Sequence, residues 1–130
     1  MANRVVHFEI QAKDLERAKK FYSETFGWKM EQMGPEMGSY VVITTGDPKE
    51  PGGINGGLVQ TDNKTWNAYS CVVSVDDIKK AMEDVKGAGG QVIDGPMDIP
   101  GVGQYALCKD TEDNFFTLLQ PSPDMTESKT

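Results

Sequence analysis

One pattern occurs twice in this chain of 130 residues, and it limits the folds that the chain can adopt. The first copy runs from Val5 to Met30 and reads VVHFEIQAKDLERAKKFYSETFGWKM. Alternating apolar residues predict a strand over 5–10, and apolar residues at three- and four-residue steps then predict a helix. Asp14 is placed to cap the start of this helix, and Gly27 is placed to end it.

The second copy begins near Tyr69 and keeps the register of the first. Residue number 77 minus 14, and 90 minus 27, both give 63, so Asp77 and Gly90 repeat the two helix-end signals. Each half of the chain therefore predicts the order strand–helix–strand–strand–strand. Two such βαβββ modules side by side predict an α+β fold with an eight-stranded, curved, mixed sheet, helices outside and a cup inside.

Polar stretches between these patterns set the expected domain boundaries. The first module is predicted over residues 1–60, a linker over 61–67, and the second module over 68–121. The last residues, 122–130, are polar and aperiodic and are expected to fray. The remaining strands are predicted from residue 28 and over 40–45, 54–60, 69–75, 91–93, 103–109 and 115–120.

Two glycines, Gly56 and Gly57, interrupt the strand predicted over 54–60. Glycines inside a strand often mark a bulge, or a place where a ligand or another backbone segment comes close. The glycine-rich stretch 52–57 lacks the lysine and the following helix of a phosphate-binding loop, which excludes that function.

Composition excludes several classes of partner. The net charge of −7 argues against nucleic acid, whose phosphates need a basic surface. No apolar run approaches the roughly 20 residues that cross a bilayer, and the N-terminus lacks the features of a signal peptide. Cys71 and Cys108 are too few and too far apart for a disulfide framework or a zinc cluster. We therefore expect a cytoplasmic protein in which both cysteines are small core residues.

The first predicted strand places two chemically active side chains on one face. His7 and Glu9 alternate with the apolar Phe8 and lie about 6.5–7 Å apart. His7 is the single histidine of the chain. The pair can bind a ligand or transfer a proton to it. In the alternative interpretation, His7 only satisfies a neighbouring group and Glu9 only lies at the wet mouth of the cup.

The rest of the predicted cup is mixed apolar and hydroxyl, which suits a small organic molecule. It contains no nucleophile with an assigned base. The aromatic side chains are expected to pack in the core, with the walls of the cup as the alternative. The lining residues are Ser70, Val72, Ser74, Phe115, Thr117 and Leu119, and the aromatic residues in question are Trp28, Tyr40, Trp66 and Tyr105.

Together these stretches resemble the vicinal oxygen chelate superfamily, which includes glyoxalase I, bleomycin-resistance proteins, fosfomycin-resistance enzymes and extradiol dioxygenases. The resemblance covers about residues 4–121. It implies the two-module fold and a homodimer. The matching stretches are VVHFEIQAKDLERAKKFYSETFGW, GGINGG, VVSVDDIKKA and DTEDNFFTLLQP.

In the metal-dependent members, the ligands come from the first and fourth strands of each half. The resemblance places these four positions on His7, near Asn55, on Ser70 and on Thr117. Only His7 is a usual ligand type, because amide and hydroxyl oxygens bind divalent ions weakly. A two-histidine, one-carboxylate iron site cannot form in one subunit. His7 is therefore expected to be a vestigial metal position, with no cofactor; a divalent metal completed by water or a partner chain is the alternative.

The resemblance and the residues lead to three functional hypotheses. The first is a metal-independent protein of the bleomycin-resistance type that binds a small organic molecule through His7, Glu9, Asn55, Ser70 and Thr117. The second is a lyase or isomerase in which His7 and Glu9 transfer protons, so the question whether the chain is an enzyme stays open. The third is a sensing or scaffold module without activity. None of them involves nucleic acid or a membrane.

Overall fold

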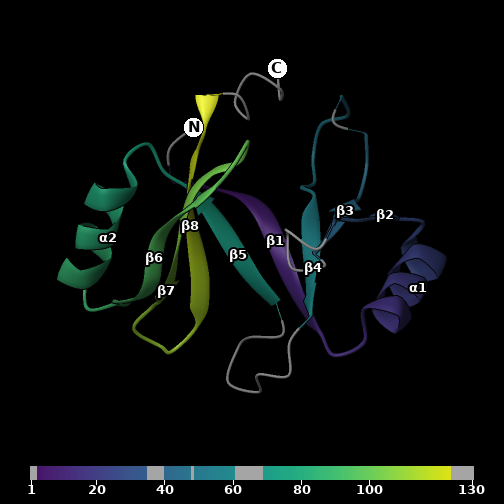
Figure 1. Ribbon diagram of the computed structural model, residues 1–130, viewed down its shortest axis with the longest axis horizontal. Coiled ribbons are helices and arrows are strands. Elements are labelled where there is room, and N and C mark those ends of the chain that lie inside the picture. The colour runs from purple at the N-terminus through teal and green to yellow at the C-terminus, as the bar shows by residue number, and fades with distance from the viewer. Residues whose placement is uncertain (1–2, 35–39, 48, 61–68, 124–130) are drawn as a thin grey trace. The chain divides into compact units, whose positions relative to one another are not determined.

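The computed structural model describes residues 3–34, 40–47, 49–60 and 69–123 (Figure 1). The chain divides into two compact units. The first unit is His7–Tyr69, and the second comprises the described residues of Met1–Val6 and Ser70–Thr130. The predicted linker 61–67 and the end of the predicted tail, 124–130, lie outside the described residues.

The first unit contains one helix and four strands (Figure 1). Its strands hydrogen-bond in the order β2-β3-β4-β1, with β1 and β4 parallel and the other pairs antiparallel. The elements are β1 (Arg4–Ala12, of which the part from His7 belongs to this unit), α1 (Leu15–Phe26), β2 (Lys29–Gln32), β3 (Val41–Thr44) and β4 (Gly56–Gln60).

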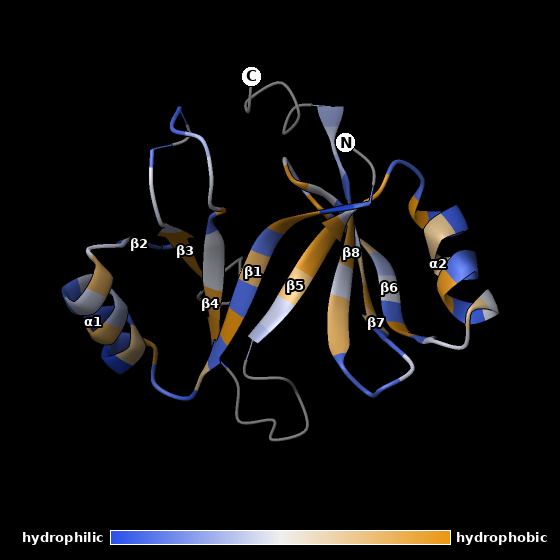
Figure 2. Ribbon diagram, turned by 180° about the vertical axis from the view of Figure 1, so that it is seen from behind, coloured by the Kyte–Doolittle hydropathy of each residue, from blue (hydrophilic) through white to orange (hydrophobic). Residues whose placement is uncertain are grey.

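Local signals in the sequence account for the helix α1. The carboxylate of Asp14 accepts a hydrogen bond from the backbone N–H of Arg17 at 3.0 Å, which satisfies a free donor of the first turn. Gly27 ends the helix in the left-handed region, at φ 73°. The apolar stripe of α1 packs on one face of the strands, and Figure 2 shows hydrophobic and hydrophilic bands alternating along β1. The buried cluster is Ile10, Leu15, Val41, Ile43 and Leu58.

The second unit repeats this plan. Its strands hydrogen-bond in the order β5-β8-β7-β6, with β5 and β8 parallel and the other pairs antiparallel. Asp77 caps its helix by accepting from the backbone N–H of Lys80 at 3.1 Å. The elements are β5 (Tyr69–Ser74), α2 (Ile78–Gly87), β6 (Gln91–Ile99), β7 (Gly103–Lys109) and β8 (Phe115–Pro121). The buried cluster is Val75, Ile78, Ala106, Cys108 and Leu118.

These elements confirm the predicted fold class, which is α+β with two βαβββ modules, eight strands in a mixed sheet and two helices. In the part of the chain that the structure describes, no helix is long and apolar enough to cross a membrane.

Three local predictions were wrong. The strand predicted over 91–93 continues to Ile99, because register shifts in its pairing with β7 let it pass Pro96 at the edge of the sheet. Cys108 is buried as predicted, but Cys71 is exposed. Ser122, predicted to fray, donates its backbone N–H to the carbonyl of Val102 at 2.9 Å.

Candidate functional site

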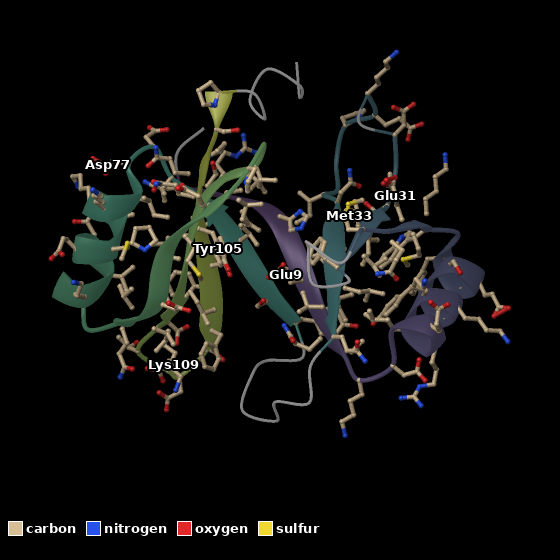
Figure 3. The ribbon with its side chains drawn as sticks, viewed as in Figure 1. Glu9, Glu31, Met33, Asp77, Tyr105 and Lys109 are labelled. Carbon is tan, nitrogen blue, oxygen red and sulfur yellow. The ribbon has the colours of Figure 1, made fainter. Side chains whose placement is uncertain are left out.

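The two faces of β1 carry different chemistry. Phe8 and Ile10 pack with the core cluster under α1. Because successive side chains of a strand point to opposite faces, His7 and Glu9 lie on the face turned away from α1. Figure 3 shows Glu9 on this strand. The predicted alternation of β1 is therefore confirmed.

Tyr40, which directly precedes β3, connects these two side chains. Its hydroxyl oxygen lies 2.8 Å from Nε2 of His7. The same hydroxyl forms a hydrogen bond with the carboxyl group of Glu9. We call the three residues the His7–Tyr40–Glu9 row. All three belong to the first unit, and all are half-buried.

The two glycines of β4 make room for this arrangement. A Cβ on Gly57 would overlap the Tyr40 hydroxyl, so only glycine lets the tyrosine reach across β4 to β1. A Cβ on Gly56 would collide instead with the backbone carbonyl and ring of Phe8. The predicted close approach at this glycine pair is confirmed, and the groups that approach are Tyr40 and Phe8.

The environment changes the proton affinity of the row. Burial raises the pKa of Glu9 above its usual value, and this effect exceeds the opposing effect of the hydrogen bond from Tyr40. Burial raises the pKa of Tyr40 as well, and the nearby Glu9 carboxylate adds to the increase. Tyr40 therefore keeps its proton and stays a hydrogen-bond donor, while Glu9 can exchange a proton closer to neutral pH than an exposed glutamate can.

The sheet register gives an internal comparison for the fourth strand of each unit. Glu9 pairs with Gly57, and Val72, which follows Glu9 by 63 residues, pairs with Thr117. The position in the first unit that corresponds to Thr117 is thus Gly57, two residues after Asn55. In the first unit the polar group at this place comes from Tyr40 on the neighbouring strand.

Asn55 has a defined local contact in the first unit. Its side-chain oxygen accepts the backbone N–H of Thr45 at 2.8 Å, which closes the connection between β3 and β4. The hydroxyl of Thr45 also donates to the carbonyl of Ile54 at 2.7 Å. The role of Asn55 in binding a ligand stays a prediction.

The other two predicted contacts belong to the second unit. Ser70 is half-buried on β5, and Thr117 is half-buried on β8 beside Val72. Leu118, the neighbour of Thr117, packs under α2, so Thr117 lies on the opposite face of β8. The predicted facing of β8 is confirmed, and the ligand roles of Ser70 and Thr117 stay predictions.

Sequence reasoning missed the role of Tyr40, which it assigned to core packing. Packing alone does not describe this residue, because its hydroxyl contacts His7 and Glu9. The signal that could have found it is the pair of glycines on β4. Trp28 does pack against the core of the first unit, and Trp66 lies outside the described residues.

The side chains around His7 do not fit the metal that the resemblance implies. Nε2 of His7 is engaged by the Tyr40 hydroxyl. Within the residues that the structure describes, no group of three or more His, Cys, Asp or Glu side chains could hold a metal ion. One imidazole, one carboxyl group and a phenol that keeps its proton are a poor donor set for a tight divalent site.

Comparisons with known proteins agree with this fold. The family model described as bleomycin resistance protein-like N-terminal matches residues 4–46. A glyoxylase-like domain-containing protein of Didymella fabae is 33% identical over 114 residues, which are 85% of this chain and 88% of the relative. The chain belongs to the vicinal oxygen chelate superfamily.

Other relatives of this vicinal oxygen chelate protein are longer than the chain. CFP32 of Mycobacterium tuberculosis, which carries the name of a glyoxylase, is 33% identical over 107 residues, which are 82% of this chain and 40% of that protein. A lactoylglutathione lyase of Arabidopsis thaliana is 29% identical over 136 residues, covering 92% of this chain and 45% of that protein. The chain thus spans less than half the length of these two relatives.

Solved structures support the fold. The methylmalonyl-CoA epimerase of Mycobacterium tuberculosis matches with a TM-score of 0.66 at 13% identity, over 95% of this chain and 91% of that chain. A methylmalonyl-CoA epimerase in complex with methylmalonyl-CoA matches with a TM-score of 0.67 at 17% identity, over 95% and 97% of the two chains. At these identities the likeness shows a shared fold.

Proposed function

We propose that the chain binds a small organic molecule at the His7–Tyr40–Glu9 row, without a divalent metal. One observation carries the proposal: a single hydroxyl, that of Tyr40, joins the imidazole and the carboxyl group on the face of β1 that α1 leaves uncovered. The predicted contacts from Asn55, Ser70 and Thr117, the cytoplasmic location and the homodimer belong to the same proposal.

The chemistry of the row supports this function. A few convergent polar groups beside apolar surface are the usual means by which a pocket orients a small ligand. The row offers a phenol that keeps its proton, an imidazole, and a carboxyl group whose pKa is raised by burial. A ligand with carbonyl or carboxylate oxygens can hydrogen-bond to these groups.

Two related proteins suggest the first compounds to test. One solved neighbour was determined in complex with methylmalonyl-CoA, and one relative is named a lactoylglutathione lyase. Both names refer to acyl thioesters. Methylmalonyl-CoA, lactoylglutathione and their free acids are therefore suitable probes, together with simple aromatic carboxylates.

Titration calorimetry in buffer that contains EDTA tests the proposal. We expect at least one probe to bind the wild type, and to bind about tenfold more weakly to Tyr40→Phe and Glu9→Gln, because each substitution removes a hydrogen-bonding group of the row. Tyr69→Phe serves as the matched control, since it removes a hydroxyl that contacts Tyr22 instead. Binding that disappears in EDTA, or that is equal in all four proteins, would contradict the proposal.

A second candidate function is a lyase or isomerase in which Glu9 and His7 transfer protons. The raised pKa of Glu9 favours it, because a general base works best when its pKa lies near the working pH. In this case Glu9 would take a proton from the substrate and return it. The exchange of deuterium from D₂O into the thioester probes should then cease in Glu9→Gln, and an unchanged exchange rate would exclude this function.

A further inference from the structure

The hydroxyl of Tyr40 has one proton and two hydrogen-bonding neighbours. An ionised carboxylate has no proton and can only accept, so Tyr40 donates its proton to Glu9. The same proton cannot also be donated to His7. At 2.8 Å, the contact between the Tyr40 hydroxyl and Nε2 of His7 must then be one in which the imidazole donates.

We infer that Tyr40 is a positioning residue that holds the neutral imidazole of His7 in the tautomer with its proton on Nε2. The lone pair of the ring then lies on Nδ1. Nε2, the nitrogen that faces Tyr40, cannot bind a cation while it carries this proton. The position that the superfamily resemblance gives to a metal ligand has become a hydrogen-bond donor.

Packing in the first unit fixes the position of the Tyr40 hydroxyl. The two residues of β3 that follow on the core side, Val41 and Ile43, are completely buried. The backbone carbonyl of Tyr40 accepts the N–H of Met33 at 2.8 Å. Gly57 leaves a passage across β4 that a Cβ would close. The hydroxyl is therefore held in place before any ligand binds.

The tautomer has a consequence for the ligand, and this step rests on the proposed function. A ligand atom that replaces Tyr40 at Nε2 of His7 meets an N–H group. It must therefore be a hydrogen-bond acceptor, such as a carbonyl or carboxylate oxygen. The site favours acids and carbonyl compounds over amines and other ligands that offer only donors.

Nuclear magnetic resonance of ¹⁵N-labelled, ligand-free protein tests the inference. His7 is the single histidine, so the spectrum contains one imidazole. At about pH 9 an ordinary histidine is neutral, and its protonated and bare nitrogens can be told apart. We expect the proton on Nε2, visible as a ring N–H signal that exchanges slowly with water. A ring with its proton on Nδ1 would overturn the inference.

Three variants separate positioning from general stability. Tyr40→Phe removes the acceptor, and Gly57→Ala displaces the tyrosine but keeps its hydroxyl; both should lose the slowly exchanging Nε2–H signal. Tyr69→Phe should keep it. If Tyr40→Phe retains the signal unchanged, Tyr40 does not hold the ring. Should Gly57→Ala fail to fold, Tyr40→Phe still decides the question.

Addition of Zn²⁺ gives an independent readout. The Nε2–H signal of the wild type should remain, and its loss with a shift of the Nε2 resonance would contradict the inference. None of these spectra requires a ligand. Failure of every probe to bind would therefore overturn the proposed function and leave the tautomer standing, whereas an Nδ1–H ring would refute the tautomer without affecting the binding result.

Discussion

Glu9 on β1 and Val72 on β5 are separated by 63 residues and pair in the same way with the fourth strand of their units, at Gly57 and Thr117. In the first unit this place holds a carboxyl group, a glycine and the incoming Tyr40 hydroxyl. In the second unit it holds a valine beside a threonine. The helix-facing residues of both units are alike in kind, so the fold constrains one face of each sheet and leaves the other face to differ.

The turns before the fourth strands differ in a similar way. Asn55 closes the β3–β4 connection with a neutral amide oxygen. Asp110 closes the β7–β8 connection with a carboxylate, which accepts the backbone N–H groups of Glu112 at 2.8 Å and Asn114 at 2.9 Å. The two turns have the same place in their units, but only the second one can titrate.

The largest expected effect tests whether the helix-facing sides are equivalent. Leu58 pairs with Ile10, and Leu118 pairs with Val73, which lies 63 residues after Ile10. Leu58→Ala and Leu118→Ala each leave a cavity under a helix, so each should lower the free energy of unfolding by about 2–5 kcal/mol. Urea denaturation measures both. A loss below about 1 kcal/mol in either variant would show that the two cores are not equivalent.

The next effect tests whether the opposite faces differ. Gly57→Ala should cost about 1–3 kcal/mol, because the new methyl group overlaps Tyr40. Thr117→Ala, at the corresponding place, should change stability by less than about 1 kcal/mol. Denaturation of the Gly57→Ala/Tyr40→Ala double variant checks the cause, since removal of the tyrosine ring should abolish most of the cost. Equal costs of Gly57→Ala with and without Tyr40 would contradict this explanation.

The helix caps should behave alike in both units. Asp14→Ala and Asp77→Ala each remove an acceptor for an N–H group of the first helical turn. Each should reduce the free energy of unfolding by about 1 kcal/mol, whereas replacement by asparagine should cost much less. Thermal denaturation followed by circular dichroism compares the four variants. A cap whose removal has no effect would break the equivalence of the two helices.

The smallest effect distinguishes the two turns by their pH dependence. Hydrogen bonds from the backbone of Asn114 and Glu112 lower the pKa of Asp110. Its stabilising contribution is therefore present above its pKa in the unfolded chain and is lost as the pH falls through the lower pKa of the folded state. Asp110→Asn should flatten the acid side of the stability curve, measured by urea denaturation at several pH values. Asn55→Ala should leave that slope unchanged, and a flattened slope there would contradict the assignment.

Much of the fold could be predicted because its signals are local. Asp14 and Asp77 start helices at the same register, and Gly27 ends the first one, so short stretches of sequence suffice. The length of β6 could not be predicted, since it depends on register shifts against β7 that let the strand pass Pro96. Strand extent is set by the partner strand as much as by the strand itself.

The candidate site could be predicted only in part. Alternation along β1 placed His7 and Glu9 on one face, which depends on neighbours in sequence alone. Tyr40 needed the order β3-β4-β1 and the register that sets Gly57 beside Glu9, and neither can be derived from alternation. The contacts assigned to Asn55, Ser70 and Thr117 came from a resemblance and stay predictions.

The central claim is that Tyr40 takes the place of a metal ion at His7. The most direct measurement is elemental analysis of the purified chain after dialysis against Zn²⁺ and Ni²⁺, followed by removal of unbound ions. The account predicts far less than one equivalent of either metal per chain. One equivalent of metal that resists removal, and that eliminates the His7–Tyr40 hydrogen bond, would contradict it.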